Sequence, residues 1–434
     1  MLGKSVAGRR PGRLLVFVCA WLFSAGAWAA AEGPHVAGVP VAFILFGVTL
    51  FGVALFHHYT LQVALTGLAT IILYKLTFTG FHGGPGLAGL GGHLAHEWVT
   101  VANLFFLLMG FALLARHFEK THIPAILPRY LPHDWRGAFL LLVLVFVISS
   151  FLDNIAAALI GGAMAHTLFR ARVHIAYLAG IVAASNAGGA GSVVGDTTTT
   201  MIWISGISPV DVLHAYAGSA VALVVSGIPA ALVQQRYSPI IKHEHHHIHI
   251  DWVRVGIVAL MLVSAIVANV TANVAFPGLA ERFPVIGVAV ATALLVSVPV
   301  RRPDWELLPE TLKGTIFLLS LVLCASMMPV EELPAASWHA ALALGFVSAV
   351  FDNIPLTALA IKEGGYDWGF LAYAVGFGGS MVWFGSSAGV ALSNLYPEAK
   401  SAVNWVKQGW YVILAYVLGF AALMAFVGWG THGT

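Results

Sequence analysis

Long uncharged apolar segments constrain this chain more than any other feature. Val36–Phe56 and Val255–Phe276 contain no Asp, Glu, Lys or Arg, and each is long enough to cross a bilayer as a helix. Only 9% of the 434 residues are charged and 59% are hydrophobic, whereas soluble domains carry about 25% charged residues. The sequence therefore predicts an all-α, polytopic membrane protein and excludes a soluble domain.

Charge balance and cysteine content exclude further classes. The 21 basic and 19 acidic residues give a net charge of +2 and leave no basic face for nucleic acid. Cys19 and Cys324 both lie in apolar segments, so neither a disulfide framework nor a thiolate metal site can form. An enzyme is not expected, because Ser386 and Ser387 have no histidine nearby in sequence to act as a base. No cofactor is expected.

The first 30 residues resemble a secretory signal peptide. A basic start precedes an apolar stretch, Leu14–Phe23, and a run of small residues, Ala25–Ala31, that includes a plausible cleavage site. The alternative, an uncleaved first membrane helix, stays open because the apolar run is short for a crossing.

Apolar segments predict about ten crossings, at 36–56, 61–80, 98–115, 173–204, 212–233, 253–274, 283–300, 314–330, 368–396 and 409–429. Segments 137–169 and 337–361 are interpreted instead as re-entrant hairpins, the first entering from the cytoplasm and the second from outside. With this topology, all Lys and Arg residues after the signal lie on the cytoplasmic side except Lys75, Arg282 and Lys362, which lie at or near the outer face. The positive-inside rule expects such an excess of basic residues in the cytoplasm. This topology predicts a multi-pass protein of a bacterial inner membrane.

Two motifs recur in the second half of the chain. The segment Ser149–Ile155, with Asp-Asn-Ile at its end, returns as Ser348–Ile354, and a Gly-Gly pair followed by a third glycine recurs with the same spacing: Gly188, Gly189 and Gly195, then Gly378, Gly379 and Gly385. Because the two hairpins open to opposite sides, the halves form an inverted-topology repeat. Such repeats, with broken helices meeting at the midplane, are typical of secondary transporters.

The repeat divides the chain into four parts. Residues 1–30 are the signal, and 31–234 are the first repeat, with hairpin 137–169 and broken helix 173–204. A His-rich cytoplasmic loop and a connecting helix occupy 235–275. The second repeat covers 276–434, with hairpin 337–361 and broken helix 368–396.

Glycine and threonine predict where the broken helices unwind. The stretch Ser185–Thr200 holds several glycines and four consecutive threonines, which are poor helix formers. Irregular backbone inside a membrane is tolerated where it lines a polar cavity, and its carbonyl and hydroxyl oxygens suit a small hard cation. The alternative is close helix packing by small residues.

Asp153, Asp196 and Asp352 are the acids that lie deepest in apolar segments. A charge there costs at least about 2.5–3.5 kcal/mol, so an intramembrane acid is a functional candidate. Such a carboxylate binds either a proton or a metal ion, and the two compete. We expect the three acids to bind sodium, although the Asp-Asn pairs could instead simply cap helices.

The predicted substrate or ion site combines these acids with polar and glycine residues of both repeats: Asp153, Asn154, Asn186, Gly188, Gly189, Ser192, Asp196, Thr197, Thr198, Asp352, Asn353, Gly378, Gly379, Ser386 and Ser387. Two loops have less specific signals. Gly80–Glu97 resembles a flexible linker. His243–His249 could bind a transition metal or sense pH, or could simply be a solvated loop.

At these motifs the chain resembles the ion transporter superfamily, which includes NhaD-type sodium/proton antiporters, citrate and dicarboxylate carriers, and arsenite permeases. The most specific matches are Asp153-Asn154-Ile155, Gly188–Thr200, Asp352-Asn353-Ile354 and Gly378–Gly389. Gly195–Trp203 is similar to the NhaD type, and the chain also resembles a group of citrate transporters. The resemblance implies a scaffold part and a transport part, with hairpin tips meeting two unwound helices, often within a homodimer.

The leading functional hypothesis is exchange of sodium or lithium for protons by alternating access. The alternative is proton- or sodium-coupled transport of citrate or another carboxylate, possibly as a metal complex. Apart from Lys362 at one edge, no Lys or Arg lies in the predicted hairpins or broken helices. Three buried acids therefore favour a cation.

Overall fold

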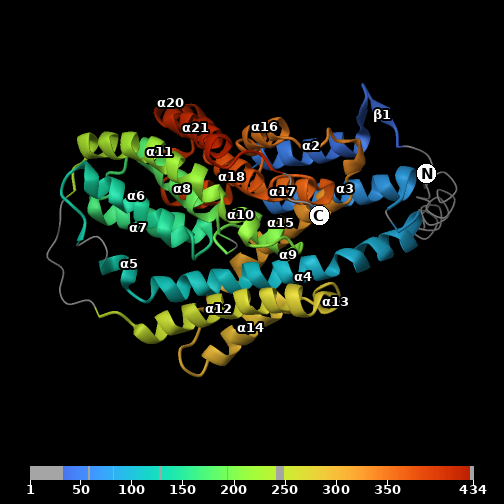
Figure 1. Cartoon of the computed structure of the whole chain (residues 1–434), viewed down its shortest axis with the longest axis horizontal. Coiled ribbons are helices and arrows are strands. Elements are labelled where there is room, and N and C mark those ends of the chain that lie inside the picture. Colours follow the sequence, from blue (N-terminus) through green and yellow to red (C-terminus); the bar gives the residue numbers. More distant parts are fainter. Residues whose placement is uncertain are drawn as a thin grey trace, which may run out of the picture.

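The fold is known from a computed structural model of the whole chain (Figure 1). It describes residues 33–430 except 57–58, 82, 127–129, 193 and 241–248. The predicted signal peptide and most of the His243–His249 cluster lie outside the described residues.

Helices form most of the described chain. The only strands in this part are β1 (His35–Val36) and β2 (Val39–Pro40), which pair antiparallel. Five helical segments are long and apolar enough to cross a membrane: Thr60–Thr79 (α3, Thr60–Tyr74, with η2, Lys75–Thr79), Gly86–Glu119 (α4), Val210–Tyr237 (α10, Val210–Leu213, with α11, Ala215–Tyr237), Trp252–Ala272 within α12 (Trp252–Ala275), and Trp305–Ser326 (η4, Trp305–Leu307, with α15, Leu308–Ser326).

A bent pair would make a sixth span. The helices α20 (Ala402–Gln408) and α21 (Trp410–Phe426) meet at 61°. Shorter apolar helices are α2 (Val41–Leu55), α6 (Trp135–Ser149), α7 (Asn154–Leu168), α8 (Ile175–Gly189), α14 (Val285–Ser297), α16 (Trp338–Ser348) and α18 (Trp368–Gly378). The chain is thus a predominantly helical, polytopic membrane protein, as predicted.

The remaining helices are short. They are α5 (Ile123–Ile126), α9 (Thr197–Ile204), α13 (Pro277–Ala280), η5 (Val330–Glu332), α17 (Asn353–Glu363), α19 (Ser387–Leu395) and η6 (Pro397–Ala399). Two of them continue an interrupted helix: α8 stops at Gly189 and α9 begins at Thr197, while α18 stops at Gly378 and α19 begins at Ser387. Both interruptions lie in the glycine-rich stretches of the sequence.

Two apolar cores hold the helices together. The larger core fills the space between α6, α7, α8, α11, α18 and α21, and its fully buried side chains include Tyr177, Tyr373 and Tyr416. The smaller core packs α2 and α3 against α15. Helices α12 and α14 pack on each other and along α4, on one side of the molecule (Figure 1).

The segment expected to be a flexible linker is mostly helix, so that prediction is wrong. Helix α4 begins at Gly86, well inside the Gly80–Glu97 segment. Leu87, Leu90 and Leu94 recur at helical spacing, and the buried His93 lies 3.0 Å from the Ser326 hydroxyl of α15. The glycines permit tight packing here, since a Cβ on Gly89 would lie 1.8 Å from the Gly84 carbonyl oxygen.

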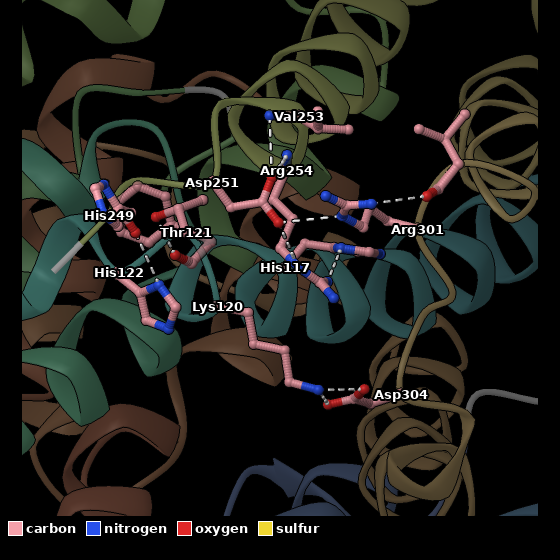
Figure 2. A network of polar contacts seen from close by, with 12 residues as sticks. His117, Lys120, Thr121, His122, His249, Asp251, Val253, Arg254, Arg301 and Asp304 are labelled. Carbon is pink, nitrogen blue, oxygen red and sulfur yellow. Dashed lines mark hydrogen bonds and ion pairs between the residues drawn. The ribbon is translucent and has the colours of Figure 1, made fainter.

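Polar side chains tie the end of α4 to the start of α12 and to the segment before α15 (Figure 2). Asp304 accepts hydrogen bonds from Lys120 at 2.6 Å and from Arg116 at 3.0 Å. Asp251 caps α12 and lies 3.1 Å from Nε of Arg301. The hydrogen bond from Lys120, with that from Arg116, lowers the pKa of Asp304 below its usual value.

Candidate functional site

Four polar side chains cap the helices that begin directly after a hairpin turn or after the interruption of a broken helix. Asp153, Asp196, Asp352 and Ser386 precede α7, α9, α17 and α19, and each side chain accepts a hydrogen bond from a backbone N–H of its own helix. Capping satisfies amide groups that a helix start leaves unpaired. The aspartates of the Asp-Asn pairs therefore do cap helices, and capping leaves carboxylate oxygens available for other partners.

The two repeats cross where these caps meet. Helix α7 of the first repeat packs against α19 of the second, and α17 of the second packs against α9 of the first. Each hairpin also packs on its own broken helix, α6 on α8 and α16 on α18. The crossing brings polar residues from distant parts of the sequence into one buried region.

Asp196 is the most enclosed of the three acids, with 1% of its surface exposed. The Asn353 amide donates to both carboxylate oxygens, at 3.2 and 3.3 Å, and the Thr198 amide donates at 3.2 Å. All three of these contacts come from neutral donors. The carboxylate is thus oriented by dipoles and carries no compensating cation from the described chain.

Asn186 connects the two repeats from the other side. Its oxygen accepts a hydrogen bond from Asn154 at 3.0 Å, and its amide donates to Ser380 at 2.9 Å and Ser386 at 3.1 Å. Asn186, Ser380 and Ser386 are fully buried. Buried polar groups of this kind are stable only when their partners are all in place, so the network fixes α8 against α18 and α19.

Asp153 and Asp352 are partly exposed and have fewer partners. The Asp352 carboxylate accepts from Ile354 N–H at 3.1 Å and from the Ser387 hydroxyl at 2.9 Å, and that of Asp153 accepts from Ile155 N–H at 3.2 Å. Asp196 is close enough to interact electrostatically with both. In the described chain, however, no three His, Cys, Asp or Glu side chains gather as a metal-ligand group.

Hydroxyl groups surround the first break. Ser192 donates to the Ser150 carbonyl at 2.6 Å, and Thr199 and Thr200 each donate to the Asp196 carbonyl at 2.9 Å. Thr197 is buried at the start of α9. The buried Thr198 hydroxyl, two residues from Asp196, has no hydrogen-bond partner among the described residues.

The predicted glycines serve close backbone approach. A Cβ on Gly188 would lie 2.1 Å from the Phe146 carbonyl oxygen, and one on Gly378 would lie 2.3 Å from the Gly345 carbonyl oxygen. Gly189 and Gly379 approach the carbonyl oxygens of Gly195 and Gly385 in the same way, at 2.5 and 2.6 Å. The first two contacts bring each hairpin against its broken helix, and the other two fold each break against the helix that precedes it. All four support the packing interpretation of the glycines.

Hydrogen bonds that the sequence analysis missed repeat across the two halves. Ser149 donates to the Ser185 carbonyl at 2.6 Å, and Ser348 donates to the Val375 carbonyl at 2.7 Å. Both serines begin the repeated motif, which was the available signal. Ser380 was also missed, because its contact with Asn186 crosses between repeats and no local pattern reports it.

The halves differ in their polar content. Gly376 lies where the repeat spacing puts the counterpart of Asn186, and Ser386 lies where it puts that of Asp196. A Cβ on Gly376 would lie 3.0 Å from Oδ2 of Asp196, so the absent side chain leaves room for that carboxylate. The two broken helices therefore share a backbone arrangement, but only the first carries an acid, Asp196, where the second has Ser386.

Helix α11 contacts the N-terminal ends of α8 and α18, the first helices of the two broken pairs. Near its own end, Gln234 accepts from the His174 N–H at 2.8 Å, and His174 caps α8. At its start, Nε2 of His214 lies 2.6 Å from the fully buried carboxylate of Asp367, which caps α18. The opposite ends of α11 thus position α8 and α18.

Interrupted helices from two halves that meet at buried polar residues are typical of one class of protein, the helical secondary transporters. Comparison with known proteins narrows that class. The chain is 28% identical over 324 residues to sodium/proton antiporter 1 of Arabidopsis thaliana, covering 64% of this chain and 54% of the relative. It is 25% identical over 342 residues to the Na(+)/H(+) antiporter NhaD of Vibrio parahaemolyticus, covering 65% and 78%.

A second plant relative, sodium/proton antiporter 2 of Arabidopsis thaliana, is 27% identical over 294 residues, covering 58% of this chain and 67% of the relative. No family model matches the chain. The matched region spans about half the length of the first Arabidopsis antiporter. These similarities confirm the predicted resemblance to NhaD-type sodium/proton antiporters.

Proposed function

We propose that this protein exchanges sodium or lithium for protons across a membrane. The observation that best supports this proposal is the buried Asp196 carboxylate. It accepts hydrogen bonds from neutral donors and forms no ion pair within the described chain. A buried carboxylate without a fixed cation is costly unless it binds a mobile one, either a proton or a metal ion. Mutual exclusion of these two ligands is the chemical basis of antiport.

Sodium would bind at Asp196 on the first repeat, with the free Thr198 hydroxyl as a further oxygen ligand. Asp153 and Asp352 would act from the hairpin tips on either side, through their charge and by holding protons. The other predicted site residues, including Asn154, Asn186, Ser192, Ser386 and Ser387, would orient this centre through the hydrogen bonds described above. No cofactor is needed, since the ions are the substrates.

The proposed topology has about ten crossings, with α6–α7 and α16–α17 as re-entrant hairpins that open to opposite sides. The excess of Lys and Arg on one set of loops supports this orientation. The proposed repeats are residues 31–234 and 276–434, joined by the His-rich loop and the connecting helix. Cleavage of the 1–30 signal, location in a bacterial inner membrane and homodimer formation also belong to this proposal.

Transport of citrate or another carboxylate is less well supported. An anion needs positive charge near its site, and within the described residues the polar contacts of Asp196, Asn186 and Ser386 come from neutral groups. The relatives found are sodium/proton antiporters rather than carboxylate carriers or enzymes.

Reconstitution into vesicles with an internal pH-sensitive dye tests the proposal. With an imposed proton gradient, sodium should evoke proton movement by the wild type, and Asp196→Asn should abolish it while the protein still unfolds at the wild-type temperature. Citrate-dependent uptake without sodium-evoked proton movement would overturn the proposal.

A further inference from the structure

An apolar groove of ≈ 340 Å³ runs along the outside of α4 and α15, away from the candidate ion site. Its walls include Glu97, Trp98, Val101, Phe105, Leu319 and Leu323. Grooves of this size and character accept aliphatic groups. Glu97 is the only charged residue that lines it.

Glu97 is partly exposed and makes no hydrogen bond or ion pair with the described residues. The charged or titratable neighbours that act on it are His96, on the same helix, and Lys362, at the end of α17. Lys362 is already engaged, because its ammonium donates to the Met328 carbonyl. Since neither Lys362 nor any other described residue forms a hydrogen bond or ion pair with Glu97, this carboxylate at the edge of an apolar groove keeps its hydrogen-bonding capacity for a ligand that carries a cation.

The dimensions of α4 place Glu97 at a membrane surface. With 34 residues, α4 is about 51 Å long, against a hydrocarbon core of about 30 Å, which needs about 20 residues. Arg116 and Lys120 mark the cytoplasmic end of α4 in the proposed orientation, so a span that ends at Arg116 begins near Glu97. Trp98, 44% exposed, fits the aromatic belt at such a boundary.

From Glu97 the groove descends along α4 to Phe106, about 13 Å toward the membrane centre. Its polar end thus lies at headgroup level and its apolar length lies among acyl chains. That polarity matches a lipid whose headgroup carries an ammonium group.

We propose that this groove binds an outer-leaflet aminophospholipid, with an acyl chain along α4 and α15 and the primary ammonium hydrogen-bonded to Glu97. A primary ammonium has three N–H donors for a charge-assisted bond to a carboxylate, whereas a choline headgroup has none. The choice of the outer leaflet rests on the orientation in the proposed function. The preference for one lipid over another does not rest on the proposed function, because it is measured without transport.

Thermal unfolding of the full chain in detergent micelles with chain-matched lipids tests the proposal. Phosphatidylethanolamine should raise the unfolding temperature of the wild type by about 2 °C more than phosphatidylcholine or phosphatidylglycerol. Glu97→Gln should remove this difference, and the matched control Glu281→Gln, at an exposed glutamate outside the groove, should keep it.

A second variant keeps the test decisive. Ala102 lines the groove, so Ala102→Trp should fill it and remove the stabilisation by phosphatidylethanolamine without changing the oligomeric mass measured by light scattering. Equal responses to the three lipids in the wild type would overturn the proposal, as would a phosphatidylethanolamine preference that survives in Glu97→Gln. A changed mass in Ala102→Trp would also overturn it, since the groove would then be an interface between copies.

Discussion

The aspartates at the helix breaks and those at the helix ends have opposite surroundings. Asp304 and Asp251 lie next to Lys120, Arg116, Arg254 and Arg301, and their role is to fasten helix ends. Asp196 and Asp352 accept hydrogen bonds from amides and hydroxyls only. An aspartate therefore has a structural role where the chain supplies a cation beside it. In the proposed function, an aspartate without such a cation is available to bind a transported ion.

After the complete loss expected for Asp196→Asn, the largest effect should come from neutralising the acids of the hairpin tips. Asp153→Asn and Asp352→Asn should each slow sodium-evoked proton movement about 10–100-fold, because each removes a charge worth about 1.5–3 kcal/mol beside the bound ion. The measurement is the initial rate in dye-loaded vesicles. Asp304→Asn is the control and should stay within about twofold of the wild type; an equal loss there would erase the distinction between the two kinds of aspartate.

Removing a neutral donor should have the next largest effect. Asn353→Ala takes both amide contacts from the Asp196 carboxylate and should raise the sodium concentration for half-maximal rate about tenfold. Asn404→Ala, at an exposed asparagine of α20, is the matched control. An unchanged sodium requirement in Asn353→Ala would show that this amide does not orient the ion-binding carboxylate.

Ser386 should matter less, because Asn186 keeps Ser380 as a second partner. We expect Ser386→Ala to slow transport about threefold, the size of its one neutral hydrogen bond with Asn186, about 0.7 kcal/mol; loss of the α19 cap should appear as a lower unfolding temperature. Comparison with Ser380→Ala and the double variant measures the coupling of the two serines. If Ser386→Ala abolished transport as Asp196→Asn is expected to do, the charge of Asp196 would not be what distinguishes the two repeats in function.

The smallest effect concerns stability at the end of α4, where Asp304 pairs with Lys120 and Arg116. Asp304→Asn should lower the free energy of unfolding by at most about 1 kcal/mol, since its partners Lys120 and Arg116 are partly exposed. Because the pKa of Asp304 is lowered in the folded state, this contribution is complete above the ordinary pKa of aspartate. It is lost as the pH falls through the lower, folded-state pKa.

Unfolding temperatures measured from pH 7 to pH 3 should therefore converge for wild type and Asp304→Asn at the acid end. A gap that widened on acidification would contradict the assignment of Asp304 as an ion-paired acid.

Local chemistry made part of this structure predictable. The Gly and Thr stretches indicate where α8 and α18 stop, because those residues are poor helix formers, and the Asp-Asn pairs indicate capped starts for α7 and α17. The spacing of the repeated glycines also aligns Ser386 with Asp196. Each of these features depends on a few neighbouring residues.

Contacts between the repeats could not be predicted in the same way. The bonds of Asn186 to Ser380 and Ser386, and of Asn353 to Asp196, depend on how α7, α9, α17 and α19 cross, which no local pattern reports. The early start of α4 was missed for a related reason. Its glycines resembled a linker until their packing against Gly84 and α15 was visible.

The glycine contacts at Gly188 and Gly378 have a consequence for motion. Each joins a hairpin to a broken helix through backbone atoms, and Ser192 and Ser150 add hydrogen bonds across the first of these seams. Main chain in direct contact with main chain has no side-chain rotamers to absorb sliding. Spin labels on the two sides of either seam should therefore keep one narrow distance distribution throughout the transport cycle, even while distances to α4 broaden.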